Sequence, residues 1–217
     1  MALDQIDEVA AQLTTAVVSD ILDRLGYFDQ VVHAGIQPIA PSMKVIGYAR
    51  TARVAEVNER PARPYALLLD SIDSLTRNDV LVLACQGRQT SALFGGLLAT
   101  AVSKTGARGV VLDGMTRDTE ELSRIGLSTF AAGRTPLDSF GRDEVVEINT
   151  PVVLGDVLIS PGDLVISDAD GTVVVPAAVA EEVVKAALEK LADEGEMRRA
   201  LRDGMPTATA FEEFGIL

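Results

Sequence analysis

Two strand-to-helix junctions follow one another within residues 94–122, and they constrain the fold more than any other feature of the sequence. Residues 78–85 (NDVLVLAC) and 109–114 (GVVLDG) are short apolar runs, which are typical of buried strands. Residues 97–104 follow a glycine pair and predict a helix, and residues 119–126 (TEELSRIG) predict a short helix that ends at a glycine. Buried strands that alternate with helices predict an α/β fold with a central strand–helix core.

The chain on either side of this core predicts the remaining elements. Before residue 134 we expect a helix over residues 4–25, a strand over 44–57, a helix over 62–74 and a strand over 128–133. After residue 143, the runs EVVEIN, PVVLGDVLIS, DLVISDADG and TVVVP are separated by Pro-Gly and Asp-Gly turns, which indicates antiparallel hairpins. Residues 177–202 predict a long terminal helix. The sequence has no internal repeat or linker, so we expect one domain over residues 1–217.

Charge and cysteine content limit the partners and the compartment. The formal net charge of −13 argues against nucleic acid or an anionic lipid surface as the main partner, although a local positive charge could still bind an anionic substrate. The single cysteine, Cys85, excludes an intrachain disulfide and favours a reducing cytoplasm. The start of the chain lacks a signal-peptide pattern, and no apolar run approaches the roughly 20 residues that cross a bilayer. We therefore expect a soluble, unprocessed cytoplasmic protein.

The two junctions also carry residue types that suit the binding of an anion and a metal ion. Gly95 and Gly96 precede a helix, whose first N–H groups can hold a carboxylate or a phosphate. Arg117 and Asp118 follow the next strand, and ligands of open α/β sheets collect at the carboxyl ends of strands. An arginine can grip a carboxylate, and an aspartate can ligate a hard cation such as Mg²⁺. A structural alternative stays open, because Asp118 and Glu121 also fit a helix N-cap with a reciprocal glutamate.

Other reactive residue types are weaker candidates. His33 is the only histidine, so a zinc site is not expected and a surface position is favoured. Cys85 lies in an apolar run and is interpreted as an inert core thiol, and Lys104 is expected to face solvent, which disfavours Schiff-base chemistry. The motifs GxGxxG, GxxxxGK[ST] and GxSxG are absent, which excludes the usual dinucleotide, triphosphate and serine-hydrolase sites. Three further charged residues are expected to brace the site rather than touch substrate: Asp20, Asp113 and Arg134.

The stretch GARGVVLDGMTRD resembles the signature of the RraA-like family, which includes the 4-hydroxy-4-methyl-2-oxoglutarate/4-carboxy-4-hydroxy-2-oxoadipate aldolases. Collinear matches run along nearly the whole chain, through LTTAVVSDILDRLG, IGYARTARV, NDVLVLA and the segment from GRTPLDSF to TVVVP. The resemblance implies a three-layer swivelling β/β/α fold. It also implies a homo-oligomer, either a trimer or a dimer of trimers, with sites between subunits.

The same resemblance implies roles for the residues at the two junctions. Arg117 would bind the keto acid end of a small 2-oxo acid substrate, and Asp118 would ligate a divalent metal cation, Mg²⁺ or Mn²⁺. A glutamate on the C-terminal helix of a neighbouring subunit, Glu194 or Glu196, would help to hold metal-bound water. The substrate carboxylate would be bound by the main-chain amides of the glycine loop, which are those of Gly95, Gly96, Leu97 and Leu98.

One residue departs from the pattern of the aldolase members. Gly96 stands where many of them carry an acid that orders metal-bound waters or shuttles a proton, which leaves the substrate open. The regulatory members that bind RNase E lack the aspartate that this chain keeps as Asp118, so the resemblance favours an enzyme. We expect a metal-dependent (class II) aldolase that cleaves a 4-hydroxy-2-oxo acid to pyruvate and a second 2-oxo acid, and that also decarboxylates oxaloacetate. The alternatives are a non-catalytic regulator of a protein partner and a decarboxylase or dehydratase of another small acid.

Overall fold

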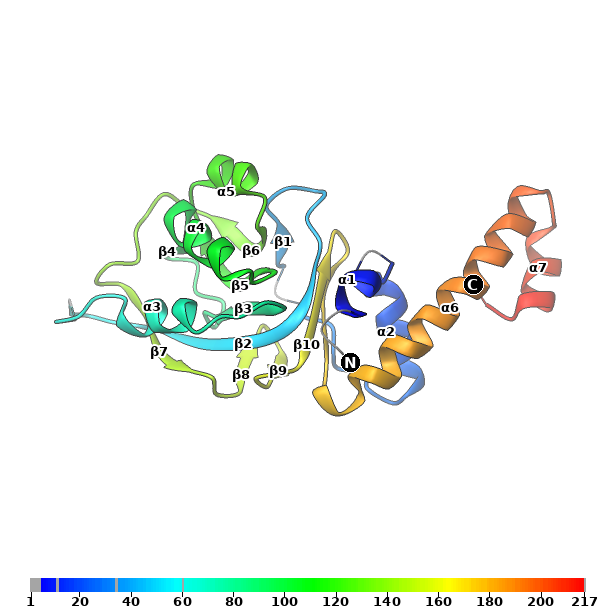
Figure 1. Cartoon of the computed structure of the whole chain (residues 1–217), viewed down its shortest axis with the longest axis horizontal. Helices are drawn as coiled ribbons and strands as arrows, with labels where there is room; N and C mark the ends of the chain where they lie inside the picture. Colours follow the sequence, from blue (N-terminus) through cyan, green and yellow to red (C-terminus); the bar gives the residue numbers. More distant parts are fainter. Residues whose placement is uncertain (1–4, 11, 34, 60, 217) are drawn as a thin grey trace.

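The computed structural model describes residues 5–10, 12–33, 35–59 and 61–216, and its centre is one large sheet (Figure 1). Among these residues, nine strands form the main sheet. Its strand order is β1 (Gln37–Pro38), β6 (Ser128–Arg134), β5 (Gly109–Thr116), β3 (Asp79–Ala84), β2 (Val45–Glu56), β10 (Leu164–Asp168) and β11 (Gly171–Val175). Two further strands lie off this path, because β4 (Ala92–Phe94) pairs with β5 and β7 (Asp143–Ile148) pairs with β2.

Parallel pairing in the middle of the sheet brings several strand ends to one edge. β3 and β6 both pair in parallel with β5, and so does β4. Side chains on both faces of β3 and β5 are buried, which explains why these strands appear in the sequence as continuous apolar runs. The residues that follow β4, β5 and β6 therefore meet at the same edge of the sheet.

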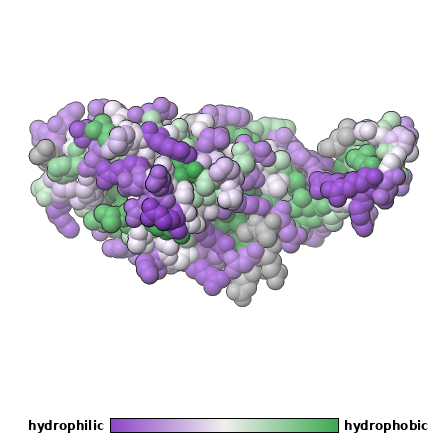
Figure 2. Space-filling model, turned by 90° about the horizontal axis from the view of Figure 1, so that it is seen from above, coloured by the Kyte–Doolittle hydropathy of each residue, from purple (hydrophilic) through white to green (hydrophobic). Residues whose placement is uncertain are grey.

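Two sets of helices cover the sheet. α3 (Ala66–Asp73), α4 (Gly96–Thr105) and α5 (Thr119–Ile125) lie next to one another and enclose the larger core, which includes Phe94 and Phe130. α1 (Gln5–Ala10), α2 (Thr15–Arg24) and α6 (Ala180–Arg202) enclose a second core with β10 and β11. α6 extends away from the sheet and α7 (Thr207–Phe214) folds back along its end, which gives the projecting arm in Figure 2.

The predicted helices near the N-terminus differ from the structure at their ends. The prediction of one helix over residues 4–25 is wrong, because α1 and α2 are separate and the side chain of Thr14 accepts a hydrogen bond from the Val17 N–H, at 3.4 Å, to cap α2. Residues 4 and 11 lie outside the described residues. The helix predicted over residues 62–74 begins only at Ala66, because Tyr65 takes a left-handed backbone conformation with φ of 61°.

The second half of the chain confirms most of the predicted hairpins. β8 (Val152–Leu154) pairs with β9 (Val157–Ile159), and β10 pairs with β11, both antiparallel. β7 instead pairs with the distant β2, because an alternating apolar run does not specify its partner. The terminal helix is present as a 3-10 turn, η1 (Ala177–Val179), followed by α6, while β1, β4 and α7 were not predicted. Within the described part of the chain, no helix combines the length and apolarity needed to cross a membrane. The extent of the domain, residues 1–217, stays a prediction.

Candidate active site

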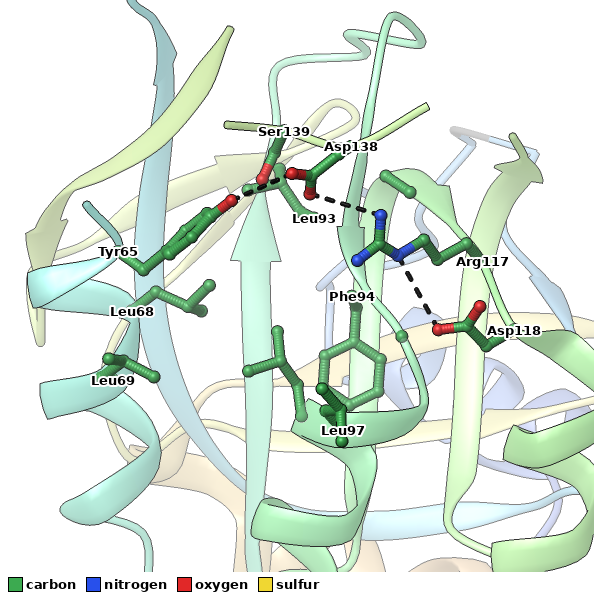
Figure 3. Close-up of a pocket in the computed structure, with 13 residues that line it drawn as sticks. Tyr65, Leu68, Leu69, Leu93, Phe94, Leu97, Arg117, Asp118, Asp138 and Ser139 are labelled. Carbon is green, nitrogen blue, oxygen red and sulfur yellow. Dashed lines mark hydrogen bonds and ion pairs between the residues drawn. The ribbon is translucent and has the colours of Figure 1, made fainter. Parts of the chain in front are cut away.

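Arg117 and Asp118 lie directly after β5, at the sheet edge where strand ends meet, and both line a pocket between α3 and α4 (Figure 3). The carbonyl of Phe94 accepts hydrogen bonds from the Arg117 N–H, at 3.0 Å, and from the Thr116 hydroxyl, at 2.8 Å. These bonds tie the end of β5 to the end of β4. The pair of residues is thus fixed beside the loop that starts α4.

Asp118 faces the pocket because it does not cap its own helix. It precedes α5 in a left-handed conformation, with φ of 56° and ψ of 40°, and its side chain makes no cap hydrogen bond. Instead, Oδ2 accepts a hydrogen bond from the Gly96 N–H at 3.1 Å and lies 3.7 Å from Nε of Arg117. The side chain remains 45% exposed. The N-cap interpretation is therefore wrong, and a conformation that is uncommon outside glycine directs this carboxylate toward the site.

Two carboxylates hold the Arg117 guanidinium. Nη1 lies 3.3 Å from Oδ1 of Asp138, while Nε faces Asp118, so neither contact uses Nη2. The Tyr65 hydroxyl donates to Oδ2 of Asp138 at 3.2 Å, which orients that carboxylate (Figure 3). Burial, followed by the charge of Asp138, raises the pKa of Tyr65, which keeps its hydroxyl a donor. Arg117 is thus held with donor groups left for a ligand.

The glycine loop leaves room for these side chains. A Cβ on Gly95 would lie 2.7 Å from Oδ2 of Asp118 and 3.0 Å from Cγ of Arg117. Of the predicted glycine loop, Gly95, Leu97 and Leu98 line this pocket, and the two leucines belong to the first turn of α4. Gly96 is not among the lining residues, and its N–H donates to Asp118, so the binding of a carboxylate by the loop stays a prediction. N–H groups in a first helical turn have no acceptor within the helix, and they favour an anion at this end. The loop can therefore present main-chain donors beside Arg117.

Asp113 braces the sheet behind the pocket. It is 1% exposed, and its carboxylate accepts hydrogen bonds from the N–H groups of Cys85, Gly87, at 3.1 Å, and Gly155, at 3.3 Å. The expected bracing role of Asp113 is thus confirmed. Burial raises the pKa of the Cys85 thiol well above its usual range, so this cysteine is inert, as predicted.

Arg134 both braces and faces the site. Its Nη2 donates to the carbonyl of Ile39 at 3.1 Å, and its side chain lines a second, open pocket with Arg117 and Asp118. Asp20 braces a different region, because it lies on α2 and pairs with Lys190 of α6. His33 and Lys104 are exposed, as expected.

Glu194 and Glu196 are not brought to Asp118 within one chain. Both lie on α6, which extends away from α4 and α5 (Figure 1). Glu194 lies 3.6 Å from both Lys190 and Arg198, and Glu196 lies 3.7 Å from Arg199. Their role at the site of a neighbouring subunit stays a prediction.

Two residues that line the pocket, and a third that lies beside it, were missed from the sequence. Asp138 follows β6, and the rule that singled out the end of β5 would have indicated it. Tyr65 comes from the segment before α3, where no motif indicates a site. Glu121 was considered only as a capping residue, whereas its carboxylate lies against Gly96.

Known proteins resemble this chain in sequence and in fold. The RraA-like family model, described as Aldolase/RraA, matches residues 15–174. A Halalkalibacterium halodurans protein provisionally named 4-hydroxy-4-methyl-2-oxoglutarate aldolase is 30% identical over 93% of this chain and 90% of its own length. The 4-hydroxy-4-methyl-2-oxoglutarate aldolase of Thermus thermophilus is 32% identical over 60% of this chain and 74% of its own.

A solved structure extends this likeness to the fold. Streptomyces coelicolor RraAS2, described as an unusual member of the RNase ES inhibitor RraA protein family, matches with a TM-score of 0.78 and 29% identity. The match covers 89% of this chain and 98% of RraAS2. It confirms the mixed α/β swivelling fold that the sequence resemblance implied.

Proposed function

The chain belongs to the RraA-like family, and from this premise we propose that it is a divalent-metal-dependent lyase, a class II aldolase. Its substrate is a 4-hydroxy-2-oxo acid, which it cleaves to pyruvate and a second 2-oxo acid. One observation carries the proposal: the side chains of Arg117 and Asp118 face a shared pocket, and the carboxylate is not used to cap its helix (Figure 3).

The donors of this site fit Mg²⁺ or Mn²⁺. Oδ2 of Asp118 accepts a hydrogen bond from Gly96, which leaves Oδ1 of a half-exposed carboxylate for a hydrated cation. Among the described residues, no group of three or more His, Cys, Asp or Glu side chains could enclose a metal ion. This suits Mg²⁺, which binds through one or two carboxylates and keeps several waters. When bound, the cation would polarise the 2-oxo group and stabilise the charge that develops there.

The residues of the chain bind and orient the substrate. Nη2 of Arg117 donates to the keto acid end of the substrate, at the 2-oxo oxygen. The N–H groups of Leu97 and Leu98 bind the substrate carboxylate. Cleavage would break the C3–C4 bond, whose electron pair moves toward C3 and the 2-oxo oxygen, beside the guanidinium. The 4-hydroxyl group would lose its proton to a water molecule as C4 becomes the oxo carbon of the second product, and a proton from water would return to C3 to give pyruvate. A preorganised donor at the 2-oxo oxygen contributes about 3 kcal/mol to the stabilisation of the transition state. Decarboxylation of oxaloacetate gives the same enolate, so the site would support that reaction too.

A pyruvate-release assay tests this proposal. Several 4-hydroxy-2-oxo acids are compared with and without EDTA, using the wild-type protein, Asp118→Asn and the exposed control Asp23→Asn. We expect EDTA to abolish release, added Mn²⁺ to restore it, and Asp118→Asn to lower kcat/KM by about 10²- to 10³-fold. Release that is insensitive to both EDTA and Asp118→Asn would show that the proposed mechanism is wrong.

Assembly is part of the proposal. Glu194 and Glu196 lie far along α6, so they would serve a site on another subunit of a homotrimer or a dimer of trimers. Light scattering after size exclusion measures the oligomeric state. A monomer with full lyase activity would contradict this part of the proposal.

A non-catalytic regulator is the second candidate, because the similar RraAS2 is described within a ribonuclease inhibitor family. A regulator would bind a ribonuclease of the RNase E type with a defined stoichiometry. Asp118→Asn would then bind the ribonuclease as well as wild type does, and neither protein would release pyruvate.

A further inference from the structure

The side chain of Glu121 fills the space in front of Gly96. Glu121 is the third residue of α5, and Gly96 is the first residue of α4. A Cβ on Gly96 would overlap Oε2 of Glu121 and would lie 2.5 Å from its Cδ and 3.0 Å from its Cγ. The carboxyl group and part of its stem therefore occupy the volume that any side chain at position 96 would need.

The Glu121 carboxylate is not neutralised by the rest of the described chain. The side chain is partly buried, yet it makes no hydrogen bond or ion pair with any residue in the described ranges. The partly buried carboxylates of Asp138 and Asp168 differ, because the Tyr65 hydroxyl donates to Asp138 at 3.2 Å and the Thr15 N–H donates to Asp168 at 2.9 Å. Because the side chain is only partly buried, its carboxylate keeps acceptor positions that a cation or a donor from outside the chain can reach.

Asp118 and Glu121 flank adjacent glycines. Oδ2 of Asp118 lies where a Cβ on Gly95 would approach it, and Oε2 of Glu121 lies where a Cβ on Gly96 would overlap it. We propose that Glu121 is a second carboxylate for the divalent cation, acting with Asp118 directly or through the cation's waters, in place of a side chain at position 96. This inference rests on the proposed metal-dependent function.

Titration of the metal-free protein with Mn²⁺ tests the inference without measuring turnover. Glu121→Gln is compared with wild type, with Asp118→Asn and with Glu120→Gln, which removes an exposed charge from the same helix. Binding is measured by calorimetry and by the EPR signal of free Mn²⁺. Loss of a group that orders the ligands of a metal lowers its affinity by about 10- to 100-fold, so we expect Glu121→Gln to weaken binding by at least about tenfold. Glu120→Gln should bind as wild type does.

The outcomes separate this inference from the proposed function. If Asp118→Asn loses Mn²⁺ binding while Glu121→Gln matches Glu120→Gln, the inference is overturned and the lyase proposal stands. If wild type does not bind Mn²⁺, both are overturned.

A relocation of the carboxylate gives a second readout. Gly96→Ala is expected to weaken Mn²⁺ binding because the added methyl group displaces the Glu121 side chain. This loss of affinity should vanish when Glu121 has already been replaced by alanine. The double variant Gly96→Asp with Glu121→Ala should regain most of the affinity that Glu121→Ala loses. Equal losses from Gly96→Ala in both backgrounds, in variants whose circular dichroism shows a native fold, would overturn the inference.

Discussion

Asp113 and Asp118 lie within and just beyond the same strand, yet their surroundings are opposite. The carboxylate of Asp113 is buried and accepts hydrogen bonds from three main-chain N–H groups in two loops, the one after β3 and the turn between β8 and β9. The carboxylate of Asp118 is 45% exposed and accepts one. The oxygens of Asp113 are occupied by hydrogen bonds within the fold, whereas Asp118 keeps acceptor positions that a ligand could use. In this molecule, the number of free acceptor and donor positions distinguishes the bracing residues from those that we propose bind substrate or metal.

The same contrast separates two arginines. Arg88 donates from Nε to Asp143 at 2.8 Å and from Nη1 to Glu56 at 2.9 Å, and the Ser91 hydroxyl also donates to the buried Asp143. The contacts of Arg117 with Asp138 and Asp118 are longer, at 3.3 and 3.7 Å. Arg88 thus closes a network that joins β2, β7 and the loop before β4, whereas Arg117 is held only loosely around an open pocket.

Replacing each arginine separately with alanine tests this contrast, and these two variants have the largest expected effects. Arg117→Ala should lower kcat/KM for pyruvate release by about 10³-fold, because it removes a donor at the reacting oxygen. Its free energy of unfolding should change by less than about 1 kcal/mol, because exposed ion pairs contribute little. Arg88→Ala should lower the free energy of unfolding by about 3 kcal/mol, because it leaves Asp143 buried without its cation. Urea unfolding and the pyruvate assay measure both, and equal destabilisation by the two variants would remove the contrast.

Alanine at the two aspartates gives the next largest effect. Asp113→Ala leaves three N–H groups without their acceptor, so the free energy of unfolding should fall by about 3 kcal/mol. Asp118→Ala should change it by less than about 1 kcal/mol, because water can replace this half-exposed acceptor. Urea denaturation followed by circular dichroism measures both values. A loss for Asp118→Ala as large as that for Asp113→Ala would show that Asp118 also braces the fold.

The strand–helix core could be predicted from the sequence, because strands buried on both faces give unbroken apolar runs. The runs over residues 78–85 and 109–114 correspond to β3 and β5. Pairing between distant strands could not be predicted, since the alternation in β7 is compatible with a hairpin and with β2. Short elements such as β4 were also missed, because three residues carry too little periodicity.

For the site, the sequence indicated the residues that follow strands but not their partners. Arg117 and Asp118 were found because they adjoin a buried strand. Tyr65 was missed because it reaches the pocket from the segment before α3, with a positive φ that no local pattern indicates. The occupancy of the space in front of Gly96 could not be predicted for a related reason, since the Glu121 side chain that lies there belongs to another helix.

Loosening the support of Arg117 should have a smaller effect than removing the arginine. Asp138→Asn weakens the ion pair with Nη1, so we expect KM to rise about tenfold while kcat changes less. Tyr65→Phe removes one hydrogen bond to Asp138 and should raise KM by about threefold. Steady-state kinetics of pyruvate release measures both. If either variant lowers kcat as much as Arg117→Ala does, it acts on the reaction and not through the arginine.

Glu144 on β7 gives the smallest expected effect. Its carboxyl group is buried like that of Asp113, but within the described part of the chain only one of its two oxygens accepts a hydrogen bond. Its Oε2 accepts the Tyr65 N–H at 3.0 Å, whereas Oε1 has no partner within the part of the chain that the structure describes. Burial raises the pKa of Glu144 above its ordinary value of 4.5, and the N–H of Tyr65 opposes this only in part.

The folded state therefore binds this proton more tightly than the unfolded state does. The protonated Glu144 therefore contributes to the free energy of unfolding. This contribution is fully present below pH 4.5 and is lost as the pH rises through the raised pKa of Glu144. Glu144→Gln should make the free energy of unfolding less dependent on pH between about pH 4 and pH 7, by about 1 kcal/mol. Glu147→Gln is the control with the opposite sign, because the hydrogen bond from Arg53 lowers the pKa of Glu147. Urea unfolding at both pH values measures the difference, and a pH dependence identical to wild type in Glu144→Gln would mean that solvent reaches Oε1.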